Sequence, residues 1–197
     1  MPKEIHNGHY AMIEELIKDY ITYPDCTQND NSRIEIMYRI ARDYHKAGQT
    51  ASATTFYFKV AQTEKNELGY ECLLQIGECF SQQGNREGTV RNMYHHALNL
   101  LPDRPEAYIL MSKNWSFNQD MQSAYTYIKQ GLEKEFTKPL RSLKKYHDKL
   151  EFYIQLIYCS WHWGKPNQAR EYYNKLKNED LTIGQKLELE RLNDLIN

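Results

Sequence analysis

The chain has 197 residues, a formal net charge of −1 at pH 7, 41% hydrophobic residues and 26% charged residues. This length can bury the core of one domain or one repeat array without disulfide or metal cross-links. The balanced charge excludes a strongly basic nucleic-acid binder, because phosphate binding uses a surplus of lysine and arginine. Tyrosine is frequent, with 16 residues against 6 phenylalanines.

The first predicted element is an amphipathic helix over residues 13–21, whose apolar residues recur at helical spacing. The polar residues before it lack the apolar run of a signal peptide, so we expect no export signal. No stretch approaches the roughly 18 apolar residues of a membrane-spanning helix. The four cysteines form no C-x-x-C pair, so we read them as small, reduced, buried thiols and expect a cytoplasmic protein.

Four further amphipathic stripes follow, beginning at positions 37, 73, 108 and 153, which are 36, 35 and 45 residues apart. Eleven residues after each start comes a turn position, occupied by Gly48, Gly84, Gln119 and Gly164. Glycine readily ends a helix in the left-handed conformation. A second apolar stripe follows every turn, so each unit is predicted to be a helix, a short turn and a helix. No segment alternates with a period of two, which predicts an all-α chain.

The boundary signals divide the chain into three predicted parts. Pro102 and Pro105 bracket one junction between helix pairs, and Pro166 stands where the first turn of a helix accepts proline. The parts are an N-terminal helix and linker (1–32), four helix pairs (33–67, 68–103, 104–149 with a basic insert, and 150–181) and a C-terminal capping helix (182–197).

Helix pairs of this length and residue pattern resemble the tetratricopeptide repeat (TPR). The resemblance is carried by a large residue opening each first helix, then a small residue (Ala41, Gly77, Ser112), then an aromatic (Tyr44, Phe80, Trp115). Small residues also recur in the second helices, as at Ala61, Ala97 and Gly131. The resemblance implies a TPR-like solenoid of about four antiparallel helix pairs, flanked by one extra helix at each end. Its first helices would line a concave groove.

A narrower resemblance is to the helical-repeat region that follows the catalytic domain of some bacterial and viral family 2 glycosyltransferases. It is carried by residues 38–44 (Tyr-Arg-Ile-Ala-Arg-Asp-Tyr), 77–79, 104–108 (Arg-Pro-Glu-Ala-Tyr) and 161–164 (Trp-His-Trp-Gly). The chain departs from that family at 138–149, which is basic where the family usually carries an acidic and aromatic insert. The resemblance implies an association with glycosyltransferase or glycan-assembly machinery.

Catalytic motifs are missing from the sequence. It contains no D-x-D motif, G-x-G-x-x-G motif, phosphate loop or G-x-S-x-G motif. Adjacent His95 and His96 point about 100° apart on a helix, so both cannot face one metal ion. We therefore expect no enzyme activity, no cofactor and no metal.

Residues of the predicted first helices that lie off the packing stripes are expected to face the groove. Aromatic residues together with arginine and lysine are the mixture that anchors protein interfaces. We expect this groove to bind a protein or peptide partner, for which a glycosyltransferase domain is one candidate. The predicted contacts are Tyr38, Arg42, His45, Lys46, Glu78, Lys113, Asn114, Phe117, Tyr158, Trp161 and His162.

The predicted basic insert has two interpretations. The simpler is a solvated connector helix, and the other is a contact for an anionic partner through Lys138, Arg141, Lys144, Lys145 and Lys149. Its charge is too small to predict nucleic-acid binding. Two alternatives to a separate binding module also follow from the sequence: an accessory part of a glycosyltransferase that contributes acceptor contacts, and a homodimer formed through exposed aromatic residues.

Overall fold

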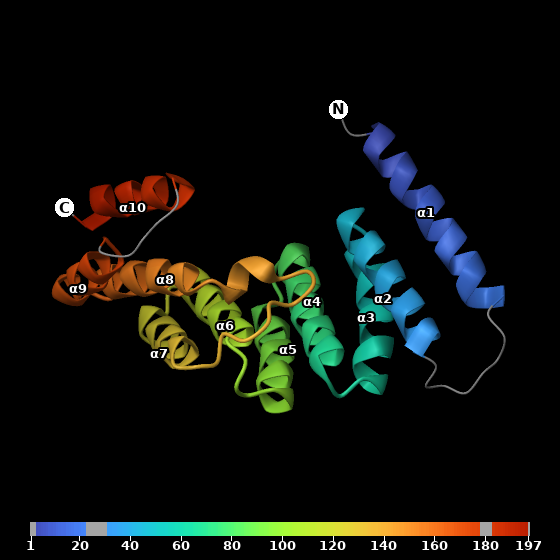
Figure 1. Cartoon of the computed structure of the whole chain (residues 1–197), viewed down its shortest axis with the longest axis horizontal. Helices are drawn as coiled ribbons and strands as arrows, with labels where there is room; N and C mark the ends of the chain where they lie inside the picture. Colours follow the sequence, from blue (N-terminus) through green and yellow to red (C-terminus); the bar gives the residue numbers. More distant parts are fainter. Residues whose placement is uncertain (1–2, 23–30, 178–182, 197) are drawn as a thin grey trace. The chain divides into compact units, whose positions relative to one another are not determined.

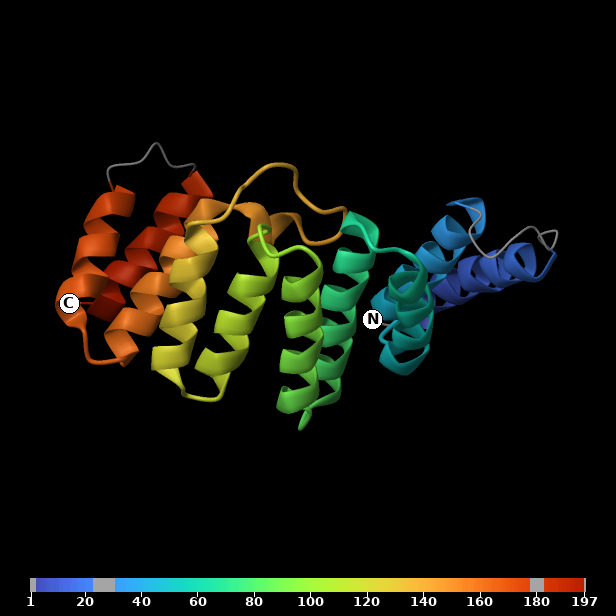
Figure 2. The same cartoon turned by 90° about the horizontal axis from the view of Figure 1, so that it is seen from below.

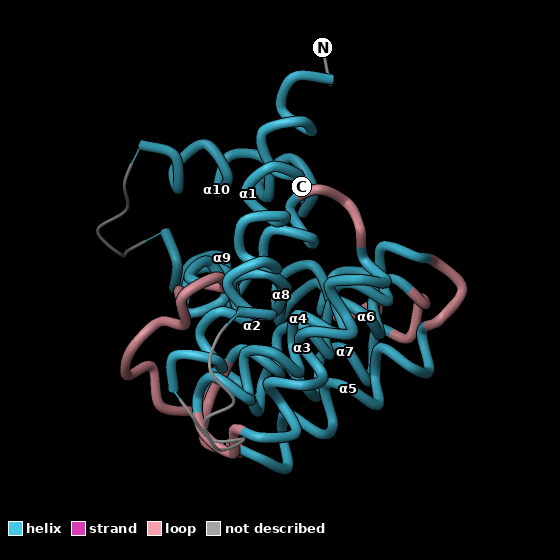
Figure 3. Tube along the Cα trace, turned by 90° about the vertical axis from the view of Figure 1, so that its right-hand side faces the viewer, coloured by secondary structure: helices cyan, strands magenta, loops and turns pink. Residues whose placement is uncertain are grey.

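The computed structural model describes residues 3–22, 31–177 and 183–196, and in these ranges it contains helices and loops but no strand (Figure 3). The helices are α1 (Lys3–Thr22), α2 (Asn31–Lys46), α3 (Thr50–Thr63), α4 (Glu67–Gln83), α5 (Glu87–Leu100), α6 (Glu106–Phe117), α7 (Met121–Leu132), α8 (Lys149–His162), α9 (Pro166–Lys177) and α10 (Ile183–Ile196), with a short 3₁₀ helix η1 (Lys144–His147) before α8 (Figure 1). The expected all-α architecture of four helix pairs with a helix at each end is confirmed.

The helices group into two compact units, one ending at Leu101 and the other beginning at Pro102. The N-terminal unit holds α1 and the pairs α2–α3 and α4–α5, and neighbours in the sequence pack against each other. In the C-terminal unit, α6, α7, α8 and α9 lie side by side in chain order (Figure 2), and α10 contacts both α8 and α9. Among the described residues, no helix combines the length and apolar character that crossing a membrane requires.

All four predicted turn residues have a positive φ. Gly48, Gly84 and Gly164 have φ values of 76°, 72° and 73°, and the non-glycine Gln119 has a φ of 63°. Glycine makes this conformation inexpensive because it has no Cβ. Each turn reverses the chain within a few residues, which places the second helix of a pair against the first.

Apolar stripes form the core of each unit. In the N-terminal unit, Met37, Ala41, Tyr57 and Ile76 belong to one buried cluster shared by α2, α3 and α4. In the C-terminal unit, a cluster joins α8, α9 and α10 through residues that include Ile157, Ala169, Leu176, Leu189 and Ile196. The last helix therefore covers the apolar end of the preceding pair.

Two glycines permit close helix contacts. A β-carbon added at Gly131 would lie 2.6 Å from Cβ of Tyr108 and 2.7 Å from Cε1 of Phe152. A β-carbon at Gly77 would overlap the ring of Tyr94. Both positions were expected to be small because of the repeat pattern, and the packing gives the physical reason.

Candidate functional site

Tyr38 was expected at the groove, but the structure buries it. Only 1% of this residue is exposed, because it packs edge-on against Tyr57 at a ring-centroid distance of 6.2 Å. Its hydroxyl donates a hydrogen bond of 2.8 Å to Oε1 of Glu71 on α4. The prediction that Tyr38 meets a partner is therefore wrong: its ring and hydroxyl join α2 to α4.

His45 lies on the same side of α2 as Tyr38, seven residues later. Its Nε2 is 3.0 Å from Nε2 of Gln82 on α4, and its ring meets Tyr57 edge-on. Burial lowers the pKa of His45 below its usual value, against the opposing effects of the Glu78 charge and of hydrogen bonds from glutamine side chains. These contacts form a polar seam between the first helices of the two N-terminal pairs.

Arg42 and Lys46 are more exposed to solvent than Tyr38. Their side chains are 38% and 54% exposed, and both cations stand near the carboxylate of Asp43, at 3.5 Å and 3.9 Å. Asp43 itself is 1% exposed. Two cations close to a buried carboxylate offset part of the cost of its burial. In the N-terminal unit, the accessible part of the predicted groove therefore consists of these two cations and the half-buried His45 and Glu78.

The C-terminal unit has a similar polar seam between α6 and α8. Gln155 of α8 donates hydrogen bonds to the hydroxyls of Ser112 and Ser116, over 3.3 Å and 3.1 Å. Lys113 pairs with Glu151 at 3.2 Å, and its ammonium also lies 4.9 Å from the ring centroid of Tyr146. Lys113 is therefore a partly engaged cation at the edge of this seam.

Exposed aromatic side chains remain beside that seam. Phe117, the last residue of α6, is 78% exposed, and Tyr158 of α8 is 37% exposed. The Tyr158 ring lies 4.4 Å from that of the exposed His162. Trp161 differs, because it packs half-buried against the cluster of α8, α9 and α10. We call Lys113, Asn114 and Phe117 of α6 together with Tyr158, Trp161 and His162 of α8 the α6/α8 surface.

The basic insert is a loop held in place by buried side chains. The simpler interpretation, which expected a connector helix here, is therefore wrong. Residues 133–148, here called the connector, contain no α-helix and only the single turn η1 (Figure 1). Leu140, Leu143 and Tyr146 are buried at 4–5% exposure, which holds the connector to the rest of its unit. The five basic residues of the prediction, Lys138, Arg141, Lys144, Lys145 and Lys149, are all exposed.

A buried ion cluster fixes the connector to the start of α6. Glu106 is fully buried and accepts hydrogen bonds from Arg104, with Nη2 at 2.6 Å and Nε at 3.2 Å. His147 of the connector places Nδ1 at 3.0 Å from the same carboxylate. Arg104 also donates to the carbonyl of Lys138, over 2.7 Å. In the sequence, Arg104 and Glu106 stand out only through the resemblance at 104–108, whereas the structure shows that both contact the connector.

In the described part of the chain, the cysteines and histidines form neither a reactive thiol site nor a metal-binding group. Cys72, Cys79 and Cys159 are buried thiols outside any disulfide, and burial raises the pKa of Cys79 and of Cys159 to about 11. A thiol in that state is a poor nucleophile. No group of three histidine, cysteine or acidic residues that could hold a metal ion occurs among the described residues. Cys26 lies outside them.

Comparison with known proteins identifies the fold. No protein-family model matches the chain, and no curated protein matches its sequence. The crystal structure of MamA has a TM-score of 0.64 with 12% identity, covering 98% of this chain and 95% of that one. TTC0263, described as a thermophilic TPR protein in Thermus thermophilus, has a TM-score of 0.61 with 16% identity, covering 96% and 95%. PilF of Pseudomonas aeruginosa has a TM-score of 0.59 with 12% identity, covering 84% and 68%. The chain therefore has a TPR fold.

Proposed function

We propose that this TPR-fold chain is a non-catalytic interaction scaffold and that the α6/α8 surface binds a protein partner. The observation that carries the proposal is the 78% exposure of Phe117 at the end of a first helix. Burying an aromatic ring of this kind contributes about 1.5–3 kcal/mol to association. Tyr158 and His162 add a second aromatic contact from the neighbouring first helix.

The chemistry of the α6/α8 surface favours an extended or helical peptide with apolar and acidic side chains. Phe117 and Tyr158 supply apolar rings, while Lys113 supplies a cation that is already shared with Glu151. Partly engaged cations at the rim of an interface contribute more to orientation and to the association rate than to affinity. Aromatic residues near the centre would supply most of the binding energy.

The connector supports a second contact with the same partner. Lys138, Arg141, Lys144 and Lys145 present four cations within eight residues, on a loop already ordered by buried leucines and by Glu106. A partner would therefore not have to bear the entropy cost of ordering this loop. We propose that acidic side chains of the bound partner meet the connector.

Quantitative capture from an extract of the source cells tests this function. The intact chain and its Ile21→Ala variant should retain the same partner. Ile21 is the control because it is an apolar residue of similar exposure, 73%, but lies on α1 and outside the α6/α8 surface. The Phe117→Ala variant should retain at least about tenfold less of it. Equal capture by Phe117→Ala and Ile21→Ala, with helicity unchanged, would contradict the assignment of the α6/α8 surface.

A finer proposal concerns the identity of the partner. The motifs at 38–44, 104–108 and 161–164 support a glycosyltransferase or another component of glycan assembly. The three buried thiols, none of which is in a disulfide, support a reducing compartment such as the cytoplasm. Identification of the captured protein by mass spectrometry tests the first point, and a partner unrelated to glycan assembly would contradict it.

A further inference from the structure

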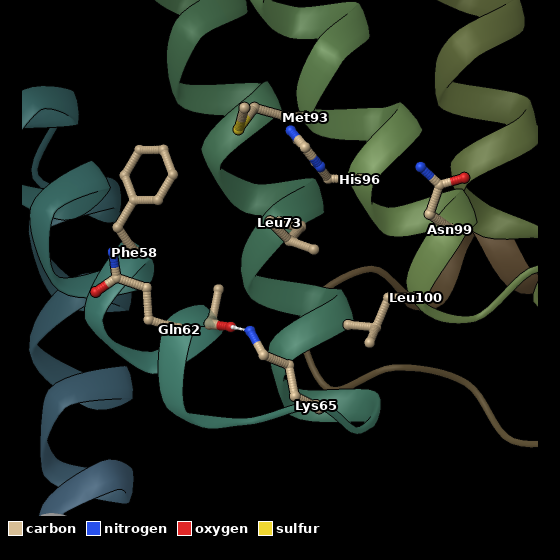
Figure 4. A pocket seen from close by; sticks show the side chains of 9 residues that line it. Phe58, Gln62, Lys65, Leu73, Met93, His96, Asn99 and Leu100 are labelled. Carbon is tan, nitrogen blue, oxygen red and sulfur yellow. Dashed lines mark hydrogen bonds between the residues drawn. The ribbon is translucent and has the colours of Figure 1, made fainter.

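The N-terminal unit contains an open cleft of about 440 Å³ between α3, α4 and α5 (Figure 4). It is separate from the predicted groove, because none of the predicted groove residues lines it. Its volume lies in the lower part of the range for ligand sites. The lining residues are Phe58, Ala61, Gln62, Lys65, Leu73, Met93, His96, Asn99 and Leu100.

Helical spacing brings these residues together. Phe58 and Gln62 stand four residues apart on α3, and Met93, His96 and Leu100 stand three and four residues apart on α5. Lys65 follows the end of α3, and its hydrogen bond to the Ala61 carbonyl holds it beside the same cleft. Residues at such intervals share one side of a helix. Leu73 of α4 lies between these two rows (Figure 4).

The apolar part of the cleft is held in place by the core. Phe58, Leu73 and Met93 are partly buried and pack against the cluster shared by α2, α3 and α4. Their positions are therefore set by packing, while part of each side chain stays accessible. An apolar side chain entering the cleft would meet an existing surface rather than one it had to create.

The polar part of the cleft is basic. Lys65 is exposed, and its Nζ donates to the carbonyl of Ala61 over 2.8 Å, which holds the ammonium beside the cleft (Figure 4). His96 is also exposed, and none of the nine lining residues is acidic. The cleft therefore complements a negative charge located beside an apolar group.

Two carboxamides complete the lining. Gln62 stands on α3 and Asn99 on α5, and both are exposed. A carboxamide offers a donor and an acceptor, which matches the N–H and C=O groups of a peptide backbone. A free fatty acid has no amide groups that could form hydrogen bonds with these two carboxamides, so the lining favours a peptide over a fatty acid.

We infer that this cleft binds a segment of a partner protein in which a bulky apolar side chain stands next to a carboxylate. The apolar side chain contacts Phe58, Leu73 and Met93, and the carboxylate lies near Lys65. The inference is independent of the α6/α8 surface, so either assignment can fail without the other.

The test is NMR of the full chain with its methionine methyl groups labelled with ¹³C. Met93 reports on the cleft, and the fully buried Met111 in the C-terminal unit is the internal control. The probes are the blocked peptide acetyl-Gly-Asp-Phe-Gly-amide, its Lys-Phe and Asp-Ala counterparts, and octanoate. We expect a saturable shift of the Met93 signal alone, with binding of the Asp-Phe peptide about threefold to fivefold tighter than of the Lys-Phe peptide. It should bind at least about tenfold tighter than the Asp-Ala peptide.

Charge reversal tests the role of Lys65. Lys65→Glu should reverse the preference between the Asp-Phe and Lys-Phe peptides, whereas Lys129→Glu, at an exposed position of α7, should leave it unchanged. The inference is overturned by a stationary Met93 signal, by a preference that Lys65→Glu does not alter, or by octanoate binding as tightly as the Asp-Phe peptide. It is also overturned if Met93 shifts with protein concentration alone and Phe117→Ala abolishes that shift, because a second copy of the chain would then fill the cleft.

Discussion

The hydroxyl of Tyr38 donates a 2.8 Å hydrogen bond to Oε1 of Glu71, and both residues are buried, at 1% and 2% exposure. This contact connects the first helices of two successive pairs. We expect Tyr38→Phe to lower the free energy of unfolding by about 1–3 kcal/mol, because a buried carboxylate loses a donor. Chemical denaturation measures the change. Tyr158→Phe, at an exposed position, is the control and should change it by less than about 0.5 kcal/mol. Equal effects of the two variants would contradict the structural role of Tyr38.

His45 should make the stability of the chain depend on pH. Burial lowers its pKa in the folded state below the usual value of 6.5, which the unfolded chain retains. At a pH between the folded-state and the unfolded-state pKa of His45, the unfolded chain binds more protons than the folded chain. The contribution of neutral His45 to stability is therefore present above pH 6.5 and is lost as the pH falls toward the folded-state pKa. The free energies of unfolding of the wild type and of His45→Gln, measured by denaturation at a series of pH values, should therefore converge as the pH falls. A His45→Gln curve that runs parallel to that of the wild type would refute the account.

The repeat register predicted the helix pairs and their turns because it depends on local spacing. The residues at the four turn positions all have positive φ, including Gln119, although no glycine marks that position. The register could not place Tyr38, which stands on a face of α2 with Arg42 and His45 and therefore reads as polar. Packing against Tyr57 buries its ring, and Glu71, 33 residues away, accepts the hydrogen bond of its hydroxyl. A hydropathy pattern contains no information about such partners.

The ion cluster at Glu106 should hold the connector in place and so limit its cleavage by proteases. Glu106→Gln keeps the shape of the side chain but removes the charge that pairs with Arg104 and lies 3.0 Å from Nδ1 of His147. Because the arginine then lies buried without its counter-charge, we expect a loss on the order of 3 kcal/mol in stability. Trypsin should cut the connector after Arg141, Lys144 and Lys145 faster in this variant, as followed by mass spectrometry. Glu135→Gln, at an exposed position of the connector, provides the control, and equal cleavage rates for the two variants would show that the cluster does not hold the loop.

Helix packing at Gly131 should tolerate no larger residue. An alanine β-carbon would stand 2.6 Å from Cβ of Tyr108 and 2.7 Å from Cε1 of Phe152, so neighbouring helices would have to move apart. We expect Gly131→Ala to reduce stability by about 1–3 kcal/mol. Gly88→Ala meets nothing within 4 Å in α5 and should be neutral or stabilising by less than about 1 kcal/mol. Thermal denaturation compares the two, and a Gly131→Ala variant as stable as Gly88→Ala would contradict the packing.

The candidate site was predicted less completely than the fold. Tyr158 and Phe117 were expected to face the groove, and both are exposed. Trp161 is partly used by the packing of the last helices, and the connector is a loop because Leu140, Leu143 and Tyr146 find buried positions without forming a helical stripe. The cleft between α3 and α5 depends on how two second helices approach each other. That distance is set by the packing of side chains in three dimensions and is not encoded in the spacing of either helix alone.

Photo-crosslinking tests the central claim, that the α6/α8 surface binds a protein partner, most directly. The probe p-benzoylphenylalanine replaces His162 on that surface in one sample and Lys129, an exposed residue of α7, in the other. We predict that the probe at 162 gives a discrete crosslinked protein in the source cells, that this product disappears in Phe117→Ala, and that the probe at 129 gives none. The same crosslinked protein from both positions, or a product from 162 that persists in Phe117→Ala, would contradict the account.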